Sequence, residues 1–471
     1  MAQLTYDQAA HLSRRMGFGA PPEELDTLTR MTRQAAVDYY LNYESVNNDN
    51  LDNYLQKNFN PKRFTPMDDV QLWWIIRMGK TARPFEEKMT LFWHNHFVSA
   101  LDKVPYETMY VQNQMLRAQA LLRFDDILLN VARDPAMLVY LDGITNVLGN
   151  PNENFARELQ ELFTMGIYDA VTGEANYTEK DVKEIARAFT GWKFKEKGGK
   201  KYKYVSYIET DKHDAGPKEI YGRIANYTGE DVIAIISERR ATARFLVKKL
   251  FNFFVYPLAD TPEDKATIEK FANVYFTGNH SIRELARAIF NSDEFFSPRA
   301  EFALIKSPAE LTVGAMRMLG ADYVPGNLHQ ADYETYVGFK SMGFDLLNPF
   351  DVSGFPTNLG WLNTSTMLER YNFAARIIST REVNKMSPGI GLANEKLKTH
   401  IASTPEQTVR NFLAVMGALK VDNQVVAILT DYLTKDDEGG RMPFEVDDHF
   451  IDKNIRGLVF LIMCLPEFQL N

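Results

Sequence analysis

The chain has 471 residues, of which 45% are hydrophobic, 12% aromatic and 24% charged. This composition excludes a chain that is disordered over most of its length, because such chains lack the apolar surface for a core. The formal charge of −9 argues against nonspecific nucleic-acid binding. The longest apolar run, Gly457–Leu465, is far shorter than the roughly 18 residues of a membrane-spanning helix, and the single cysteine, Cys464, excludes an intramolecular disulfide.

The N-terminal segment has apolar residues at helical spacing, which predicts a helix that begins after Thr5 and ends at Gly17. Thr5 and Gln8 fit a capping box, and glycine commonly ends a helix. The other segments with helical periodicity are 67–97, 106–133, 151–166, 178–190, 229–256, 262–276, 280–294, 306–319, 364–380, 405–419, 422–434 and 447–464. We therefore predict a mainly α, multi-helix globular protein.

Residues 191–228 depart from this helical pattern. Side chains alternate in character on both sides of Gly198-Gly199, which predicts a small β-hairpin insertion near 192–207. Six lysines lie in this hairpin segment. They fit a solvated hairpin, with a contact for an acidic partner as the alternative.

The breaks in the pattern divide the chain into three regions. We assign 1–190 to an N-terminal helical region, 191–228 to the hairpin and loop insertion, and 229–471 to a C-terminal helical region. The last region contains a long loop at 323–363 that is rich in Gly, Pro and Asn and has aromatic residues in its second half. A loop of this length in a compact protein is usually functional or well packed. Residues 382–392 have the composition of a linker.

Two histidines in an aromatic segment, His94 and His96, are candidates for a metal or catalytic site. Residues two apart on a helix point about 200° away from each other, so both would bind one ion only if the helix ended at His96. Core histidines that bond to the backbone or a carboxylate are the alternative. Glu87 shares a face with His94 but lies two turns away, too far to share an ion. The neighbouring Trp93 is expected to be a buried core anchor.

Glu158 is the best acid/base or ligand candidate in the predicted helix that contains it. Asn154, Glu158 and Glu161 form a stripe beside the apolar face, and Glu158 is nearest to the apolar boundary. A carboxylate there is costly to bury unless it is paired or bound to a cation. Surface ion pairs among Glu153, Arg157 and Glu161 are the structural alternative.

His213 and Asp214 form an adjacent pair in a glycine-containing loop. Such a pair can orient a general base or supply two metal ligands, although alone it is a weak signal. The sequence contains no Gly-x-Gly-x-x-Gly before a helix, no Gly-Lys-Ser/Thr phosphate loop, no His-Glu-x-x-His and no Gly-x-Ser-x-Gly. Nucleotide-dependent and simple serine-hydrolase activities are therefore disfavoured.

Ordered motifs extend along nearly the whole chain, for example Phe-Trp-His-Asn-His-Phe at 92–97. The motifs lie at 11–19, 87–97, 132–137, 140–143, 152–164, 188–192, 213–218, 306–311 and 361–366. Together they resemble a large bacterial family known only as a domain of unknown function, numbered eighteen hundred. The loop at 348–355 also resembles a family segment, with Phe355 in place of the family's usual Trp.

The resemblance implies some context but no reaction, because the family has no assigned activity. Many members look exported and are encoded beside a partner that resembles the sulfatase and alkaline-phosphatase group, so such a partner is implied here. This chain differs from those members, since its N-terminus has no basic segment followed by an apolar stretch. We therefore expect a cytoplasmic location, with no nucleic-acid partner and no membrane span.

Two functions follow as hypotheses. The first is a metal-dependent oxidoreductase or hydrolase, with Glu158 and Asp214 as catalytic groups. Its metal ligands would be His94, His96, Glu158 and His213. This His/carboxylate set suits a divalent transition metal such as zinc, iron, copper or manganese. The second is a non-enzymatic helical binding or scaffold protein whose aromatic loop at 344–361 holds a polymer or a protein partner.

Overall fold

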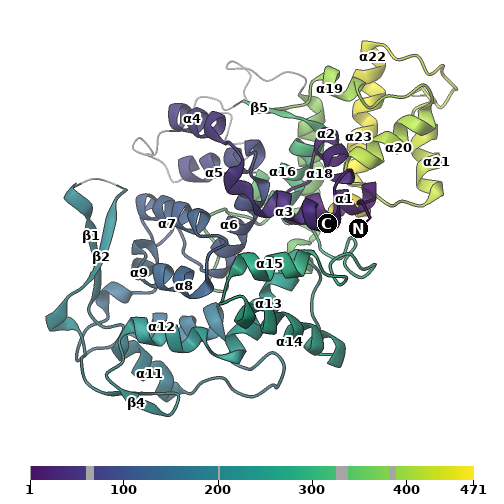
Figure 1. Ribbon diagram of the computed structural model, residues 1–471. Helices are drawn as coiled ribbons and strands as arrows, with labels where there is room; N and C mark the ends of the chain where they lie inside the picture. The colour runs from purple at the N-terminus through teal and green to yellow at the C-terminus, as the bar shows by residue number, and fades with distance from the viewer. Residues whose placement is uncertain (1, 60–67, 200–201, 325–337, 381–388, 437) are drawn as a thin grey trace.

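The computed structural model describes residues 2–59, 68–199, 202–324, 338–380, 389–436 and 438–471. Helices form most of this part of the chain, and the strands form three short antiparallel pairs. Figure 1 shows the helices packed against one another, with the hairpin β1–β2 projecting from one side. The predicted mainly α fold with a small hairpin is confirmed. Within these residues, no helix has both the length and the apolar character needed to cross a bilayer.

The helices of the first half are short and follow one another closely along the chain. They are α1 (Tyr6–Met16), α2 (Pro22–Thr29), α3 (Arg33–Leu41), α4 (Asp49–Asn58), α5 (Asp68–Lys80), α6 (Pro84–His96), α7 (Tyr106–Ala118), α8 (Phe124–Ala132), α9 (Pro135–Tyr140), α10 (Asn154–Glu158) and α11 (Glu179–Ala188). Those of the second half are α12 (Gly229–Ser237), α13 (Arg240–Phe254), α14 (Pro262–Thr277), α15 (Ile282–Phe290), α16 (Pro308–Leu319), α18 (Thr364–Ser379), α19 (Asn394–Lys398), α20 (Pro405–Val415), α21 (Asn423–Tyr432), α22 (Asp448–Phe450) and α23 (Arg456–Cys464).

Side-chain caps define where many of these helices begin. Thr5 and Gln8 form the predicted capping box of α1, and Thr178, Thr228 and Ser307 cap α11, α12 and α16 in the same way. Each box satisfies backbone N–H groups that have no partner within the helix. The sequence therefore specifies these helix starts locally.

Three long predicted helices are each divided into two, and one of these, 229–256, becomes α12 and α13. The segment 67–97 breaks after Lys80, because Pro84 opens α6 and the residue before a proline avoids the helical conformation. The segment 106–133 breaks between α7 and α8, where the Phe124 N–H donates to the His280 carbonyl at 2.9 Å. That second break depends on a distant part of the chain and has no local signal.

The strand pairs are short. In the hairpin, β1 (Trp192–Glu196) pairs with β2 (Tyr204–Ile208), with Trp192 opposite Ile208, close to the predicted boundaries. The other pairs are β3 (Lys218–Ile220) with β4 (Arg223–Ala225), and β5 (Asp322–Val324) with β6 (Gly389–Gly391). Most of the predicted linker at 382–392 and part of the 323–363 loop lie outside the described residues.

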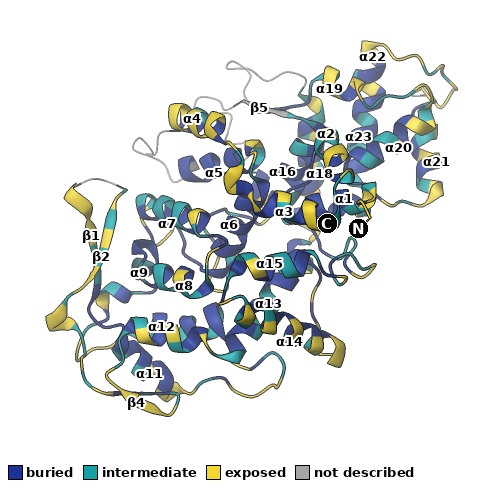
Figure 2. Ribbon diagram, viewed as in Figure 1, coloured by how far each residue is buried: buried dark blue, intermediate teal, exposed yellow. Residues whose placement is uncertain are grey.

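Buried apolar side chains form two clusters, visible as the dark interior of Figure 2. The first is built mainly by helices between α1 and α15, and the second by α4, α5, α16, α18, α20, α21 and α23. Helix α6 contributes to both, since Phe92 and Trp93 belong to the first cluster and Leu91 to the second. The C-terminal end of α6 therefore lies at the boundary between the two cores. The three-region division of the chain stays a prediction.

Candidate functional site

His94 and His96 lie in the last turn of α6, which ends at His96. The His94 ring centre lies 5.4 Å from that of Trp74, whereas His96 packs against Phe97 with ring centres 4.5 Å apart. The two rings thus face different neighbours, as their spacing predicts. Burial lowers the pKa of each to about 3, with Lys249 adding to the effect at His96, so both rings are neutral near pH 7.

A π-helical turn, Leu159–Thr164, brings a backbone acceptor to His96. Carbonyls at the end of a helix have no partner within it, and the Phe163 oxygen lies 2.9 Å from Nε2 of His96. Because a carbonyl only accepts, we assign the ring proton to Nε2. The buried Nδ1 is then an unprotonated acceptor, and it has no hydrogen-bond partner in the described part of the chain.

Glu158 is half-buried at the end of α10, and the charges that act on it are those of Glu161 and Arg157. Burial and the Glu161 carboxylate raise its pKa, while Arg157 opposes the shift. Glu161 accepts a hydrogen bond from the Tyr177 hydroxyl at 3.1 Å, and Arg157 pairs with Glu153 at 3.3 Å. The surface ion pair that was the structural alternative is therefore present beside Glu158.

His213 and Asp214 attach their loop to the end of α11. Nδ1 of His213 lies 2.9 Å from the Thr190 carbonyl oxygen, and the Asp214 carboxylate accepts from Arg187 Nε at 2.7 Å. The Arg187 hydrogen bond lowers the pKa of Asp214. Both side chains thus make contacts that hold the loop.

The four predicted metal ligands are not brought together in one place. Among the described residues, no group of three or more His, Cys, Asp or Glu side chains lies close enough to hold an ion. A zinc site normally needs at least three protein ligands in one tetrahedral arrangement. As arranged, these donors do not fit a single ion, and the metal site stays a prediction.

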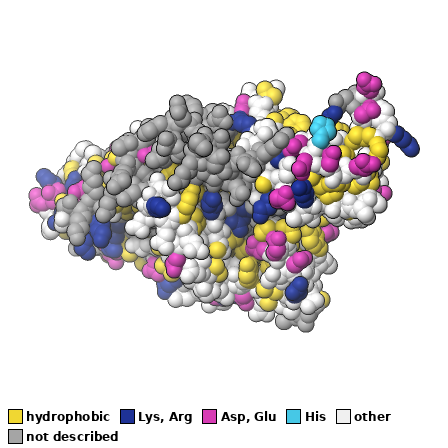
Figure 3. Space-filling model, turned by 90° about the horizontal axis from the view of Figure 1, so that it is seen from above, with side chains coloured by type: hydrophobic (Ala, Val, Ile, Leu, Met, Phe, Trp, Pro, Cys, Tyr) yellow, Lys and Arg dark blue, Asp and Glu magenta, His cyan; other side chains and the backbone are white. Residues whose placement is uncertain are grey.

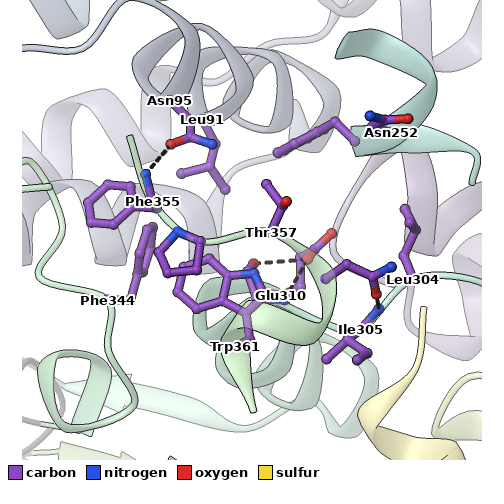
Figure 4. A pocket seen from close by; sticks show the side chains of 14 residues that line it. Leu91, Asn95, Asn252, Leu304, Ile305, Glu310, Phe344, Phe355, Thr357 and Trp361 are labelled. Atoms are coloured by element: carbon purple, nitrogen blue, oxygen red, sulfur yellow. Dashed lines mark hydrogen bonds between the residues drawn. The ribbon is translucent and has the colours of Figure 1, made fainter. Parts of the chain in front are cut away.

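A cleft opens where the end of α6 meets α13 and the loop that precedes α18. It consists of an inner hollow and a larger outer hollow. The residues that line both hollows are Asn95, Asn252, Phe253, Phe355, Pro356 and Thr357. Figure 4 shows the inner hollow, with side chains from α6, α13, α16 and the loop pointing toward one another.

Asn95 joins α6 to the loop. Its Oδ1 accepts a hydrogen bond from the Phe355 N–H at 2.6 Å (Figure 4). Gly354 has φ +95°, and a Cβ atom there would lie 2.5 Å from Asn95 Oδ1. Glycine is required at this position by both the backbone conformation and the close approach. Together these residues set the place of the Phe355 ring between the two hollows.

The inner hollow combines aromatic walls with one paired carboxylate. The ring centre of Phe344 lies 4.4 Å from that of Phe355 and 5.5 Å from that of Trp361. Glu310 accepts from the backbone N–H of Ser307 at 2.8 Å and forms an ion pair with Lys88. Although burial opposes ionisation, Lys88 holds the pKa of Glu310 below its usual value. This carboxylate is therefore ionised and fully paired.

The outer hollow has basic side chains and no acidic one. Lys248 and Lys249 from α13 line it together with His96, Phe245 and Tyr168, and none of its lining residues is Asp or Glu. Lys249 has no ion-pair or hydrogen-bond partner within the described residues, and burial lowers its pKa. Its Nζ lies 5.4 Å from the centre of the Phe245 ring. Tyr168, 65% exposed, stands at the open side.

Sequence reasoning identified His96 and the aromatic loop but missed three residues of the cleft. Asn95 lies between the two histidines, Glu310 lies in the motif at 306–311, and Lys249 lies on a helix with no motif. The first two had a signal in the ordered motifs. Lys249 had none, because its lack of a partner is visible only after folding.

The distribution of charged side chains on the outer surface can be followed for one face of the molecule. Figure 3 shows acidic, basic and apolar side chains interspersed over the described part of that face, without a broad area of one charge.

Comparison with known proteins assigns a family but no activity. No curated protein and no solved structure matches the chain. One family model, described as "Protein of unknown function (DUF1800)", matches residues 11–470. Because the match covers nearly the whole chain, the protein belongs to the DUF1800 family.

Proposed function

We propose that the cleft binds a small amphipathic anion, a molecule with a flat apolar part and one negatively charged group. The observation that carries this proposal is the division of the cleft into an aromatic inner hollow and an outer hollow with two lysines and no carboxylate. Ligand sites are typically concave and mostly apolar, with a few polar groups that orient the ligand.

The aromatic part of the ligand is matched by the inner hollow. Phe344, Phe355 and Trp361 have exposed fractions of 2%, 7% and 6%, and all three line the inner hollow. A platform for a polymer needs exposed rings, and within this loop Phe350 alone, 99% exposed, meets that requirement. These exposures favour a small molecule over the polymer or protein partner considered from the sequence.

The charge of the ligand is matched by the outer hollow. Lys248 lines it, and Asp260, a carboxylate that this lysine acts on, is not among the lining residues. Glu310, which lines the inner hollow, is already neutralised by Lys88. An anion in the outer hollow therefore meets lysine side chains and no lining carboxylate, and the low-dielectric walls strengthen the attraction.

A pair of dyes tests this function. Anilinonaphthalene sulfonate carries two aromatic groups and one sulfonate, and N-phenylnaphthylamine has the same rings without the charge. We expect the sulfonate to bind at least about tenfold more tightly, which corresponds to ~1.4 kcal/mol. Fluorescence titration of both dyes measures the ratio. Equal affinities would contradict the proposal.

Two lysine variants locate the binding. Lys248→Met should abolish most of the preference for the charged dye, because it removes a cation from the outer hollow. Lys270→Met is the matched control, since Lys270 is paired with Glu294 at 2.7 Å and lines neither hollow. A preference that survives Lys248→Met would place the anion elsewhere.

The metal-dependent oxidoreductase or hydrolase remains a second proposal that rests on the residue types alone. Elemental analysis of the purified, tag-free protein tests it, and a stoichiometric content of zinc, iron, copper or manganese would support it. The partner related to the sulfatase and alkaline-phosphatase group also remains a prediction, and co-purification of the two proteins tests it.

A further inference from the structure

Lys249 differs from the other lysine of the outer hollow by what surrounds it. Its ammonium would face Phe245 and the neutral ring of His96, whereas Lys248 interacts with the carboxylate of Asp260. A buried charge without a counter-ion is costly, and burial accordingly lowers the pKa of the Lys249 amine.

We propose that Lys249 is a nucleophile that captures an aldehyde or ketone bound in the cleft, through an imine at Nζ. The inference rests on the proposed function for the ligand's position, and it adds a carbonyl group to that ligand's chemistry. A desolvated lysine amine that borders a hollow and has no counter-ion in the described chain is an arrangement that activates this nucleophile.

The step balances without an oxidant or a reductant. The lone pair of Nζ forms a bond to the carbonyl carbon, the carbonyl π pair moves to oxygen, and a proton passes from nitrogen to that oxygen. The carbinolamine then loses its hydroxyl group and the remaining nitrogen proton as water, which leaves a C=N bond. One amine and one carbonyl compound therefore give one imine and one water.

The neutral ring of His96 is held in one orientation on the same hollow. It lines the same hollow as Lys249, and its Nδ1 is an unprotonated acceptor without a hydrogen-bond partner in the described chain. The bond from Nε2 to the Phe163 carbonyl fixes that tautomer.

Reductive trapping tests the proposal on the full chain. The protein is incubated with 4-carboxybenzaldehyde and cyanoborohydride, which reduces an imine to a stable secondary amine. Peptide mass mapping then measures the labelling rate of each lysine. We expect Lys249 to be labelled at least about tenfold faster than Lys248. Similar rates at the two lysines, or faster labelling at surface lysines, would overturn the proposal.

Variants and a second probe separate this inference from the proposed function. Lys249→Met and Lys249→Arg should both lose the rapid labelling, while Lys270→Met should keep it. Benzaldehyde, which has no carboxylate, should label Lys249 more slowly than its charged analogue. Equal labelling by the two aldehydes would contradict the anion site yet retain the nucleophile, and the absence of rapid labelling by either would overturn the nucleophile even if the dye preference held.

Discussion

Two regions of this molecule bury charged side chains, and they do so in opposite ways. In the first, Glu87 is completely buried, and its oxygens accept from Arg77 Nε at 2.6 Å, Arg117 Nε at 2.6 Å and Trp74 Nε1 at 2.8 Å. Although burial favours the neutral acid, Arg117 and Arg77 lower the pKa of Glu87 to about 2. In the second, Lys249 lies in the cleft without a partner in the described chain.

The difference shows that burial of a charge is not by itself a sign of function. Glu87 lies next to the His94 segment and has a strongly shifted pKa, yet each carboxylate oxygen is satisfied by a cation or a ring N–H. Such a network holds helices together. Lys249, in contrast, has no hydrogen-bond or ion-pair partner in the described chain and borders the outer hollow. This arrangement leaves its amine available to a ligand.

The largest expected effect on the free energy of unfolding is at Glu87, the buried carboxylate that is paired with two arginines. Glu87→Gln removes the charge that both Arg77 and Arg117 require, so the free energy of unfolding should fall by about 3–5 kcal/mol. Denaturant unfolding measures the loss. Glu395→Gln is the control, because Glu395 forms an exposed pair with Lys398 and such pairs contribute about 0–1 kcal/mol. Similar losses in both variants would show that the buried Glu87 network stabilises the protein no more than an exposed ion pair does.

A pH dependence tests the neutral histidine beside the Glu87 network. The pKa of His94 is about 3 in the folded chain, against about 6.5 when unfolded. Because the unfolded state binds the proton first, the stability is intact above pH 6.5 and is lost as the pH falls toward 3. His94→Gln should therefore remove about 2 kcal/mol of the decline between pH 7 and pH 5. Unfolding free energies at both pH values measure it, and parallel curves would contradict the prediction.

A smaller effect is expected where α6 holds the loop. Asn95→Ala removes the acceptor of the Phe355 N–H, so the free energy of unfolding should fall by about 1 kcal/mol. The Phe355 ring should also lose its fixed place, which weakens binding of anilinonaphthalene sulfonate. Denaturant unfolding and dye titration give the two values. An unchanged dye affinity would show that Asn95 does not shape the cleft.

The smallest expected effect on the free energy of unfolding is at Lys249, which has no partner in the described chain. Lys249→Met should change the free energy of unfolding by less than about 0.5 kcal/mol, or raise it, because the variant buries no uncompensated charge. The same denaturation assay applies. A loss of more than about 2 kcal/mol would mean that Lys249 has a stabilising role like that of Glu87, and the comparison between the regions would fail.

Periodicity and capping act over a few residues, so the amino-acid sequence was enough to predict the helical class, the hairpin near 192–207 and helix starts such as that of α1 at Thr5. The contact of Asn95 with Phe355, 260 residues away, appears only in the folded chain. The same is true of Lys249, which has no partner among the described residues. Contacts between distant segments and the absence of a partner have no local signature, since they depend on how the two cores pack on either side of α6.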